Sequence, residues 1–558
     1  MDNAQISFIA WRFYLILLVI ALAVGGLAYR AFDLTVLDQF FLRQQGNERV
    51  LRLVSAPAFR GMILDRNGFP LAVSTPVYSV WINPYEISLS TAVLSPLLHK
   101  LQIKPKEMTK IIQHAQKNDR EFVYLRRGLA PQLAEQIRAL AITGVYLQKD
   151  SRRYYPEGEV TGHVIGLTNV DDQGQEGLEL AFNDWLQGEP GRKWVIKDRI
   201  GRTISEVQTL QEQKPGHDLI LSIDKRIQYL AYRELLAGVT KDQVESASVV
   251  VLDAKTGEVL AMVNQPSFNP NNRLIPNTEN LRNRAVTDTF EPGSTMKAFS
   301  ISLALKSGHY TADTVINTSP GWMRVGHNLV KDEHNNGLLT VRQILDKSSN
   351  VGVTKMILTL PRDQLWEILH RVGFGEVSGI GFPGEQSGSL LKHQPWGDFT
   401  LATLAWGYGL SINTLQLARA YAVIAMHGKK LPVSLLRLDH PPAGEQIMDA
   451  DIANQILLLL ESVVTEKGAT GYMARIPGYR VGGKTGTAWI ASHGGYEKHN
   501  YNAIFVGIAP ISDPRLVVAV VMHNPRGKYY HGGTVSGPVF KKIMEGSLRI
   551  LNVPPDAA

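Results

Sequence analysis

The stretch FEPGSTMKAFSISLAL, residues 290–305, decides the fold. Pro292 and Gly293 end a loop, and apolar residues continue after Ser294, so the stretch predicts a helix that begins near this serine. Lys297 follows one turn later on the same helix face, because residues three apart are neighbours on a helix surface. The sequence therefore places an amine within reach of a serine hydroxyl, as an activated nucleophile requires.

The pattern Ser-x-x-Lys is a weak signal by itself, since a serine at this place often only caps a helix. It occurs again at Ser222 and at Ser389. We interpret Ser222 as the cap of the amphipathic helix that follows it. The copy at Ser389 is followed by Pro395, which stops a helix before an apolar face can form. Only the copy at Ser294 opens a long apolar helix.

A second motif, Ser348-Ser349-Asn350, lies between two predicted helices. Its loop can bring one hydroxyl and one amide toward the nucleophile. A competing Ser-x-Asn at Ser411 fits turn chemistry better.

A third motif, GGKTGTA at residues 482–488, predicts a strand at a sheet edge, where small residues let a ligand approach closely. Strand alternation places Lys484 and Gly486 on one face and Thr485 and Thr487 on the other. A cation with nearby hydroxyls suits a peptide carboxylate.

Nucleotide and metal chemistry fit the sequence poorly. Residues 478–485 satisfy the P-loop pattern, but a P-loop opens a helix directly after Lys-Thr, whereas Gly486 and Thr487 continue a strand pattern. The 15 histidines include no HExxH pair, and the absence of cysteine excludes Cys-ligated metals and thiol catalysis. We therefore expect no cofactor and no metal.

The composition describes a folded chain of several domains. The 558 residues are too many for one ordinary domain, and 44% of them are hydrophobic. Lys and Arg number 58 against 51 Asp and Glu, a net charge of +7 without basic runs. This charge pattern argues against a nucleic-acid groove.

One segment near the N-terminus is apolar enough to cross a membrane. Residues 13–29 carry no charge and span about 26 Å as a helix, close to the ~30 Å hydrocarbon core. A signal peptide is the competing interpretation, but its candidate cleavage site, Ala21-Leu22-Ala23, lies inside the apolar run. We expect an uncleaved anchor. Arg12 and Arg30 flank the run, so charge alone specifies its orientation poorly.

Changes in composition and hydrophobic pattern along the chain predict five parts. They are a short tail (1–12), a transmembrane anchor (13–31), an irregular α+β pedestal (32–216), a compact α/β domain (217–550) and a flexible tail (551–558). The compact domain begins with a predicted strand, an amphipathic helix and a β-hairpin.

The order Ser-x-x-Lys, Ser-x-Asn, Lys-Thr-Gly resembles that of the penicillin-binding transpeptidases. The resemblance extends to most of the chain and is strongest to the class B, high-molecular-weight group. Further segments similar to class B signatures are Arg60-Gly61, Asp65 to Gly68, Arg153 to Pro156, Gly162-His163, Gly177 to Glu179, Glu291 to Gly293, Tyr408-Gly409, Phe505 to Gly507, Gly532-Gly533 and Pro538 to Phe540.

This resemblance implies a serine β-lactamase-like fold, an antiparallel sheet sandwiched by helices, on a dimerisation-like pedestal. It also implies roles for the motif residues. Ser294 is the acyl-ester nucleophile, Lys297 the general base, Ser348 a proton relay, and Asn350 orients Lys297 and the substrate. The oxyanion hole consists of the backbone N–H groups of Ser294 and Thr487. Lys484, Thr485 and Thr487 bind the substrate carboxylate, Gly486 is a further substrate-binding residue, and Tyr408 and Tyr501 wall the cleft.

The implied activity is a serine-type D-Ala-D-Ala transpeptidase that crosslinks peptidoglycan stem peptides and is acylated by β-lactams. Within class B, the resemblance favours a septal role in cell division; an elongation role and a non-catalytic, β-lactam-sensing scaffold are the alternatives. A bifunctional class A enzyme is disfavoured because the chain contains no Glu-Asp dipeptide. Implied partners are a polytopic SEDS glycan polymerase and other divisome proteins. The implied location is the inner membrane, with a cytoplasmic N-terminus and a periplasmic catalytic domain.

Overall fold

The computed structural model describes residues 3–42, 44, 51–56, 58–88, 90–197, 203–272, 277–390, 397–492 and 495–557. The chain divides into two compact units. The first comprises residues 1–59, 76–151 and 188–215, and the second comprises residues 60–75, 152–187 and 216–558.

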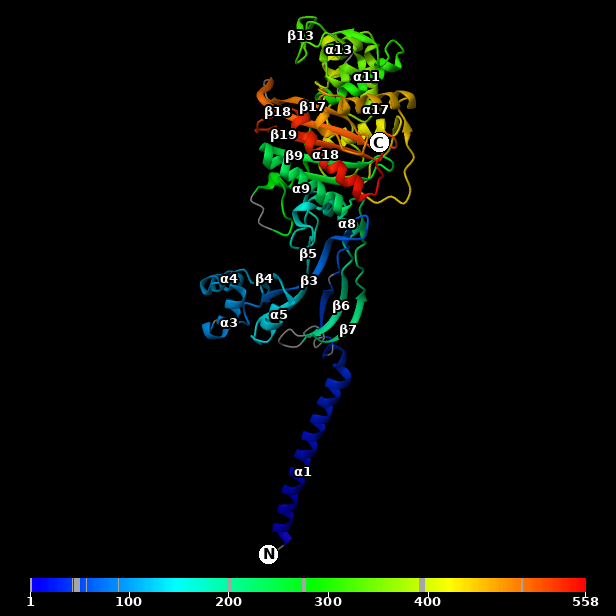
Figure 1. Cartoon of the computed structure of the whole chain (residues 1–558). Helices are drawn as coiled ribbons and strands as arrows, with labels where there is room; N and C mark the ends of the chain where they lie inside the picture. The colour runs from blue at the N-terminus through cyan, green and yellow to red at the C-terminus, as the bar shows by residue number, and fades with distance from the viewer. Residues whose placement is uncertain are drawn as a thin grey trace. The chain divides into compact units, whose positions relative to one another are not determined.

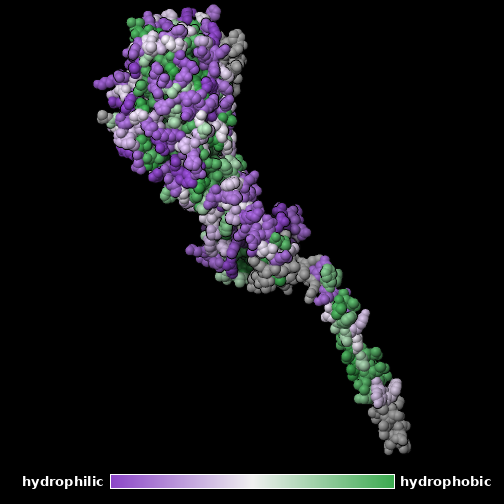
Figure 2. All heavy atoms as spheres, turned by 90° about the vertical axis from the view of Figure 1, so that its right-hand side faces the viewer, coloured by the Kyte–Doolittle hydropathy of each residue, from purple (hydrophilic) through white to green (hydrophobic). Residues whose placement is uncertain are grey.

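The first unit begins with a long exposed helix, α1 (Asn3–Phe32), which continues into the π-helical turn Asp33–Leu37. The stretch Trp11–Leu37 has a mean hydropathy of 2.2, and none of it is buried. Figure 2 shows hydrophobic residues over the visible face of this helix. By length and composition it can cross a membrane, which fits a single-pass membrane protein.

The rest of the first unit contains a small α/β layer and a separate antiparallel sheet. Apolar side chains such as Val80, Leu97 and Ile112 form the core between three helices and the strands beside them. The helices are α3 (Thr91–Leu101), α4 (Pro105–Lys117) and α5 (Pro131–Arg138); the strands are β3 (Pro70–Ile82, from residue 76 onward), β4 (Val123–Leu129) and β5 (Val145–Tyr154, up to residue 151). The separate sheet has the order β1 (Leu51–Ala56), β6 (Gly191–Lys197), β7 (Thr203–Gln211).

The second unit is built on a five-stranded antiparallel sheet. Its strand order is β10 (Val259–Gln265), β9 (Val244–Asp253), β19 (Leu516–Pro525), β18 (Gly495–Ala509), β17 (Gly482–Ser492), which leaves β17 at an edge. The motif strand is thus an edge strand, as expected. The predicted hairpin is the β9–β10 pair, which turns at Gly257 with a φ of +76°.

Helices cover both faces of this sheet (Figure 1). On one face, α9 (Lys225–Asp242) and α18 (Gly532–Ile550) pack against alternate strand residues such as Val249 and Phe505. On the other face, α11 (Lys297–Lys306), α16 (Thr414–Ala425) and α17 (Ala450–Thr465) pack against Val250 and Ile504. The fold class predicted from the sequence is therefore confirmed.

Shorter elements complete the second unit. They are β2 (Ile63–Leu64), α6 (Gly162–Ile165), α7 (Gly177–Ala181), α8 (Asn183–Leu186), β8 (Leu219–Ile220), α10 (Arg284–Thr287), β11 (Val315–Asn317), β12 (Trp322–Val325), β13 (Asn328–Lys331), β14 (Leu338–Thr340), α12 (Val341–Asp346), α13 (Asn350–Ile357), α14 (Arg362–Arg371), α15 (Asp398–Ala405), β15 (Lys429–Lys430) and β16 (Glu445–Gln446).

The interpretation of Ser222 as a helix cap is wrong. Helix α9 begins three residues later, at Lys225, and its cap is Asp224, whose carboxylate accepts a hydrogen bond from the backbone N–H of Arg226 at 3.0 Å. The Ser222 hydroxyl instead donates to the carbonyl of Val259 at 2.7 Å. In the Ser389 copy of the pattern, residues 391 and 392 lie outside the described residues.

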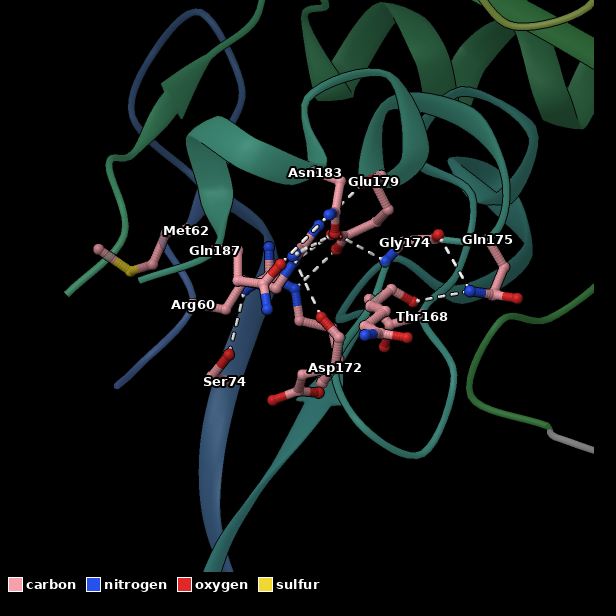
Figure 3. Close-up of polar contacts among 12 residues, drawn as sticks. Arg60, Met62, Ser74, Thr168, Asp172, Gly174, Gln175, Glu179, Asn183 and Gln187 are labelled. Atoms are coloured by element: carbon pink, nitrogen blue, oxygen red, sulfur yellow. Dashed lines mark hydrogen bonds and ion pairs between the residues drawn. The ribbon is translucent and has the colours of Figure 1, made fainter. Parts of the chain in front are cut away.

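A buried ionic cluster joins three chain segments of the second unit. The Glu179 carboxylate accepts hydrogen bonds from Arg60 Nε at 2.7 Å and from Arg153 Nε at 2.6 Å, and the three side chains are at most 2% exposed. Figure 3 shows Arg60 directed at Glu179 and Asn183, and its guanidinium also donates to the backbone carbonyl of Asp172 at 3.1 Å. Three class B-like segments thus meet at one carboxylate.

We expect Glu179→Ala to lower the free energy of unfolding by about 3–5 kcal/mol, because it leaves two buried guanidinium groups without their anion. Thermal unfolding of the full chain in detergent measures the effect. Asp513→Ala is the matched control, since it removes an exposed partner of Lys255 and should change stability by about 1 kcal/mol or less. Equal unfolding temperatures for the two variants would contradict this account of the cluster.

Candidate active site

The serine of the first motif lies in a short turn rather than in the α-helix itself. Ser294 belongs to the 3₁₀ turn Gly293–Met296, and α11 begins immediately afterwards at Lys297. The turn is held by a hydrogen bond from the Gly293 N–H to the carbonyl of Gly407 at 3.0 Å. A Cβ atom on Gly407 would lie 2.0 Å from the carbonyl oxygen of Gly293, so this approach requires a glycine.

Lys297 brings the first two motifs together. Its side chain is fully buried, and Nζ lies 3.1 Å from Ser294 Oγ, 3.1 Å from Ser348 Oγ and 2.7 Å from Asn350 Oδ1. It also reaches the Ser348 carbonyl at 2.5 Å. The residues that the sequence placed in two separate motifs therefore surround one amine.

Lys484 brings the third motif to the same place. It is also fully buried, and its Nζ donates to Ser348 Oγ at 3.1 Å and to Thr485 Oγ1 at 3.3 Å. The Ser348 hydroxyl oxygen thus accepts from both lysines, which leaves its own proton free to point elsewhere. Ser348 has a φ of +59°, a left-handed conformation that a packed surrounding must stabilise.

Burial lowers the pKa of both lysines. The pKa of Lys297 lies well below its ordinary value, because burial disfavours the ammonium and the neighbouring Lys484 repels it, while Asp332 opposes the shift. Burial lowers the pKa of Lys484 to about 7, with Asp346 opposing. The shift at Lys297 favours its neutral amine, the form that can accept a proton.

One aspartate holds the second motif in place and another anchors the helix before it, and sequence reasoning missed both. Asp332 accepts from the Ser349 hydroxyl at 2.6 Å and from the backbone N–H of Val351 at 2.9 Å. Asp346 is buried and accepts from the Ser462 hydroxyl at 2.6 Å. Both contacts join residues far apart in the chain, so no local pattern predicts them.

The third motif packs closely against the turn that carries Ser294. A Cβ atom on Gly486 would lie 2.9 Å from the Pro292 carbonyl oxygen. Close packing against this carbonyl therefore favours glycine at position 486. Lys484 and Gly486 lie on the α11 face of the sheet, and Thr485 and Thr487 lie on the α18 face, as alternation predicts. Thr485 is buried. The Thr487 hydroxyl accepts from the backbone N–H of Gly532 at 3.2 Å.

The two candidate cleft tyrosines differ in their surroundings. Tyr408 is half-buried, and its hydroxyl accepts from the backbone N–H of Trp489 on β17 at 3.2 Å. Tyr501 lies on β18, on the same sheet face as Thr487, and stacks on Tyr530 with ring centroids 4.5 Å apart. The structure therefore brings Tyr408 against the motif strand, whereas Tyr501 packs against the loop before α18.

Glu291 is a further polar group, beside the turn that carries Ser294. Its Oε1 accepts from the backbone N–H of Gly409 at 2.8 Å and from the Tyr496 hydroxyl at 3.2 Å, and burial raises its pKa. Its place three residues before Ser294 was noted in the sequence, but nothing there indicated these partners. Within the described ranges, no group of three His, Asp or Glu side chains is placed to hold a metal ion.

Comparison with known proteins agrees with this geometry. Residues 247–545 match the family described as "Penicillin binding protein transpeptidase domain", and residues 55–221 match the family described as "Penicillin-binding Protein dimerisation domain". The fold and the site thus define a penicillin-binding transpeptidase.

Relatives match over nearly the whole length. The probable peptidoglycan D,D-transpeptidase PbpC of Pseudomonas aeruginosa is 43% identical over 98% of this chain and 96% of that protein. The peptidoglycan D,D-transpeptidase FtsI of Escherichia coli K12 is 42% identical over 99% of this chain and 94% of that protein. The chain belongs to the class B penicillin-binding proteins.

Solved structures show the same fold. The transpeptidase domain of penicillin-binding protein 3 from Burkholderia pseudomallei is 40% identical, with a TM-score of 0.56 over 61% of this chain and 98% of that one. Penicillin-binding protein 3 from Mycobacterium tuberculosis, solved in complex with aztreonam, is 25% identical, with a TM-score of 0.70 over 90% of this chain and 98% of that one.

We expect Asp346→Asn to shift the alkaline limb of the pH–rate profile for acylation by penicillin to lower pH. The ionised Asp346 raises the pKa of Lys484, so removing its charge lowers that pKa further below about 7, and the Lys484 cation is lost at a lower pH. Asparagine can still accept from Ser462, so the packing is kept. The measurement is the acylation rate constant as a function of pH.

The matched control for Asp346→Asn is Asp513→Asn, which removes an exposed carboxylate. Its alkaline limb should coincide with that of the wild type. An unshifted limb in Asp346→Asn, at an acylation rate that shows an intact site, would contradict the coupling to Lys484.

Proposed function

We propose that this protein is a serine D,D-transpeptidase that crosslinks peptidoglycan stem peptides during septal wall synthesis. The observation that carries the proposal is the contact of one buried amine, Lys297 Nζ, with Ser294 Oγ, Ser348 Oγ and Asn350 Oδ1. Such an arrangement supplies a nucleophile, a base and a relay in one place. Relatives named peptidoglycan D,D-transpeptidase FtsI and PbpC, similar over nearly the whole chain, support the substrate class.

In the first half-reaction, Ser294 Oγ attacks the carbonyl carbon between the two D-alanines of a donor stem peptide. The serine proton passes to the neutral amine of Lys297. The backbone N–H groups of Ser294 and Thr487 stabilise the negative oxygen of the tetrahedral intermediate. The Ser348 hydroxyl relays a proton to the leaving nitrogen, the C–N bond breaks, and free D-alanine departs from an acyl-Ser294 ester.

In the second half-reaction, an amine of a neighbouring stem peptide attacks the ester carbonyl. The amine loses a proton to Lys297, which is again neutral after the first half-reaction. The bond between the acyl carbon and Ser294 Oγ breaks, a proton returns to the serine oxygen, and the new amide is the crosslink. Asn350 holds the Lys297 amine in line with both steps through its 2.7 Å hydrogen bond.

Charge and hydroxyl groups on and beside the motif strand recognise the donor. Lys484, as a cation, binds the terminal carboxylate together with the hydroxyls of Thr485 and Thr487, and Gly486 leaves room for the peptide against the strand. Thr487 then exchanges its contact with Gly532 for the ligand. Tyr408 walls the cleft beside Trp489, and Tyr501 contributes from β18, where it pairs with Trp489. A β-lactam enters as a mimic of the donor and acylates Ser294.

The membrane arrangement follows from the substrate. Residues 1–12 form a cytoplasmic tail and residues 13–31 anchor the chain in the inner membrane. The pedestal (32–216), the transpeptidase domain (217–550) and the tail (551–558) then lie in the periplasm, where stem peptides are crosslinked. At the septum, the anchor and pedestal contact a polytopic SEDS glycan polymerase and other divisome proteins, which supply the glycan strands.

Incubation of the full chain in detergent with benzylpenicillin should give one covalent adduct per molecule, measured as an increase in intact mass. Ser294→Ala should abolish the adduct, because it removes the attacking oxygen. The control is Ser389→Ala, which alters another copy of the Ser-x-x-Lys pattern and should leave the adduct unchanged. Labelling that survives Ser294→Ala would contradict the assignment of the nucleophile.

A further inference from the structure

A cavity of about 640 Å³ lies in the second unit, on the same sheet face as Lys484. Its floor is formed at one end of three neighbouring strands, β9, β19 and β18, which lie side by side in Figure 1. Its wall includes Thr289 and Phe290, directly before the nucleophile turn. None of the groups assigned above to the reaction lines this cavity.

Three polar side chains form a row across the cavity floor. In the sheet register, Ser246 pairs with His523, and His523 pairs with Asn502, so the three lie next to one another on adjacent strands. Further along the same strands, this sheet face carries apolar residues, Val250, Ala519 and Ile504. The three polar side chains take the place of such residues at the cavity floor. Strand alternation predicts apolar core residues at these positions, so the polar groups found there require hydrogen-bond partners.

Two of these side chains are buried without a complete set of partners. Ser246 is 7% exposed and Asn502 is 4% exposed. Asn502 Oδ1 lies 2.7 Å from His523 Nδ1, but its amide nitrogen and the Ser246 hydroxyl have no hydrogen-bond partner among the described residues. Both groups line the cavity, so they are available to a bound molecule.

The cavity wall carries both signs of charge. Arg284 Nη1 donates to Asp288 Oδ2 at 2.8 Å, and both side chains line the cavity together with Arg282 and Glu245. A polyanion would meet the carboxylates, and a polycation would meet the guanidinium groups. The other wall charges are paired as well, Arg282 with Glu279 and Asp288 at 3.2 Å and Glu245 with Arg526 at 3.6 Å, so a ligand without net charge, such as a zwitterion, suits the wall best.

His523 adds a neutral acceptor to the floor. Burial lowers its pKa, and the charged groups that face it are Glu245, Asp288, Arg284 and Glu497. When Nδ1–H donates to Asn502 Oδ1, the other ring nitrogen, Nε2, can accept a hydrogen bond. The site thus offers acceptors to an ammonium group, and Asn502, Ser246 and Arg284 offer donors to a carboxylate.

We propose that this cavity is a second binding site, separate from the catalytic cleft, for the zwitterionic end of an amino acid. The source of such a ligand rests on the proposed function. One source is the D-alanine released in the first half-reaction, and the other is the free amino-acid end of an acceptor side chain such as diaminopimelate. Occupancy places the ligand against Thr289 and Phe290, where Phe290 N–H is bonded to the carbonyl of Ile412 at 2.9 Å.

The test is binding of D-alanine and of meso-diaminopimelate to the full chain in detergent, measured by saturation-transfer difference NMR and calorimetry. The protein is first acylated with benzylpenicillin, so that the catalytic cleft is filled. We expect saturable one-to-one binding of at least one of the two probes to the acylated protein. Ser246→Ala and His523→Ala should each weaken it by about tenfold or more, since a charged ligand loses a hydrogen bond.

The matched control is Ser307→Ala, a serine at the end of α11, which should leave binding unchanged. Binding of D-alanine alone would identify the leaving group as the ligand, and binding of meso-diaminopimelate alone would identify the acceptor. Absence of saturable binding of both probes to the acylated protein would overturn the proposal, as would binding that neither cavity variant weakens. Failure of the wild type to become acylated would instead overturn the proposed function, and the probes are then tested on the free protein.

Discussion

The burial of two lysine amines around one serine hydroxyl is the constraint on which the site depends. Lys297 and Lys484 are both fully buried, and each donates to Ser348 Oγ at 3.1 Å. Two ammonium ions that both contact the same hydroxyl oxygen in the protein interior would repel each other strongly and would lose their hydration. The lowered pKa of Lys297 favours its neutral form, which relieves this repulsion, and a neutral amine is the form that the proposed role as base for Ser294 requires.

The fold serves this constraint by bringing three distant segments to one point. A 3₁₀ turn presents Ser294, helix α11 carries Lys297, and the edge strand β17 carries Lys484. The loop between α12 and α13 supplies Ser348 in a left-handed conformation. Asp332 accepts from the neighbouring Ser349 hydroxyl at 2.6 Å, and Asp346, the last residue of α12, accepts from the Ser462 hydroxyl of α17 at 2.6 Å. Close approach of turn and strand requires glycine at the contact points. The motif segments that carry the two lysines and the serines are therefore also the segments that pack closely against one another.

The sequence could predict those parts of the structure that leave a local pattern. Two apolar runs on either side of a turn predicted the β9–β10 hairpin, and the run after Ser294 predicted a helix, although α11 begins only at Lys297 behind a 3₁₀ turn. The cap of α9 was misassigned because Ser222 and Asp224 are both capable caps, and only the start of the helix decides between them. The roles of Asp332, Asp346 and the floor of the second cavity depend on contacts between distant segments, which no spacing rule reveals.

The most direct test of this account is the ionisation state of Lys297. The protein is labelled with lysine carrying ¹³C at Cε, and the Cε signals are followed by NMR as pH is varied, with Lys297→Arg to assign the signal. We predict two lysine signals that titrate well below the ordinary value of about 10.4, one near 7 from Lys484 and one from Lys297 that is absent in the variant. A Lys297 signal that titrates near 10.4 would contradict the assignment of Lys297 as the base.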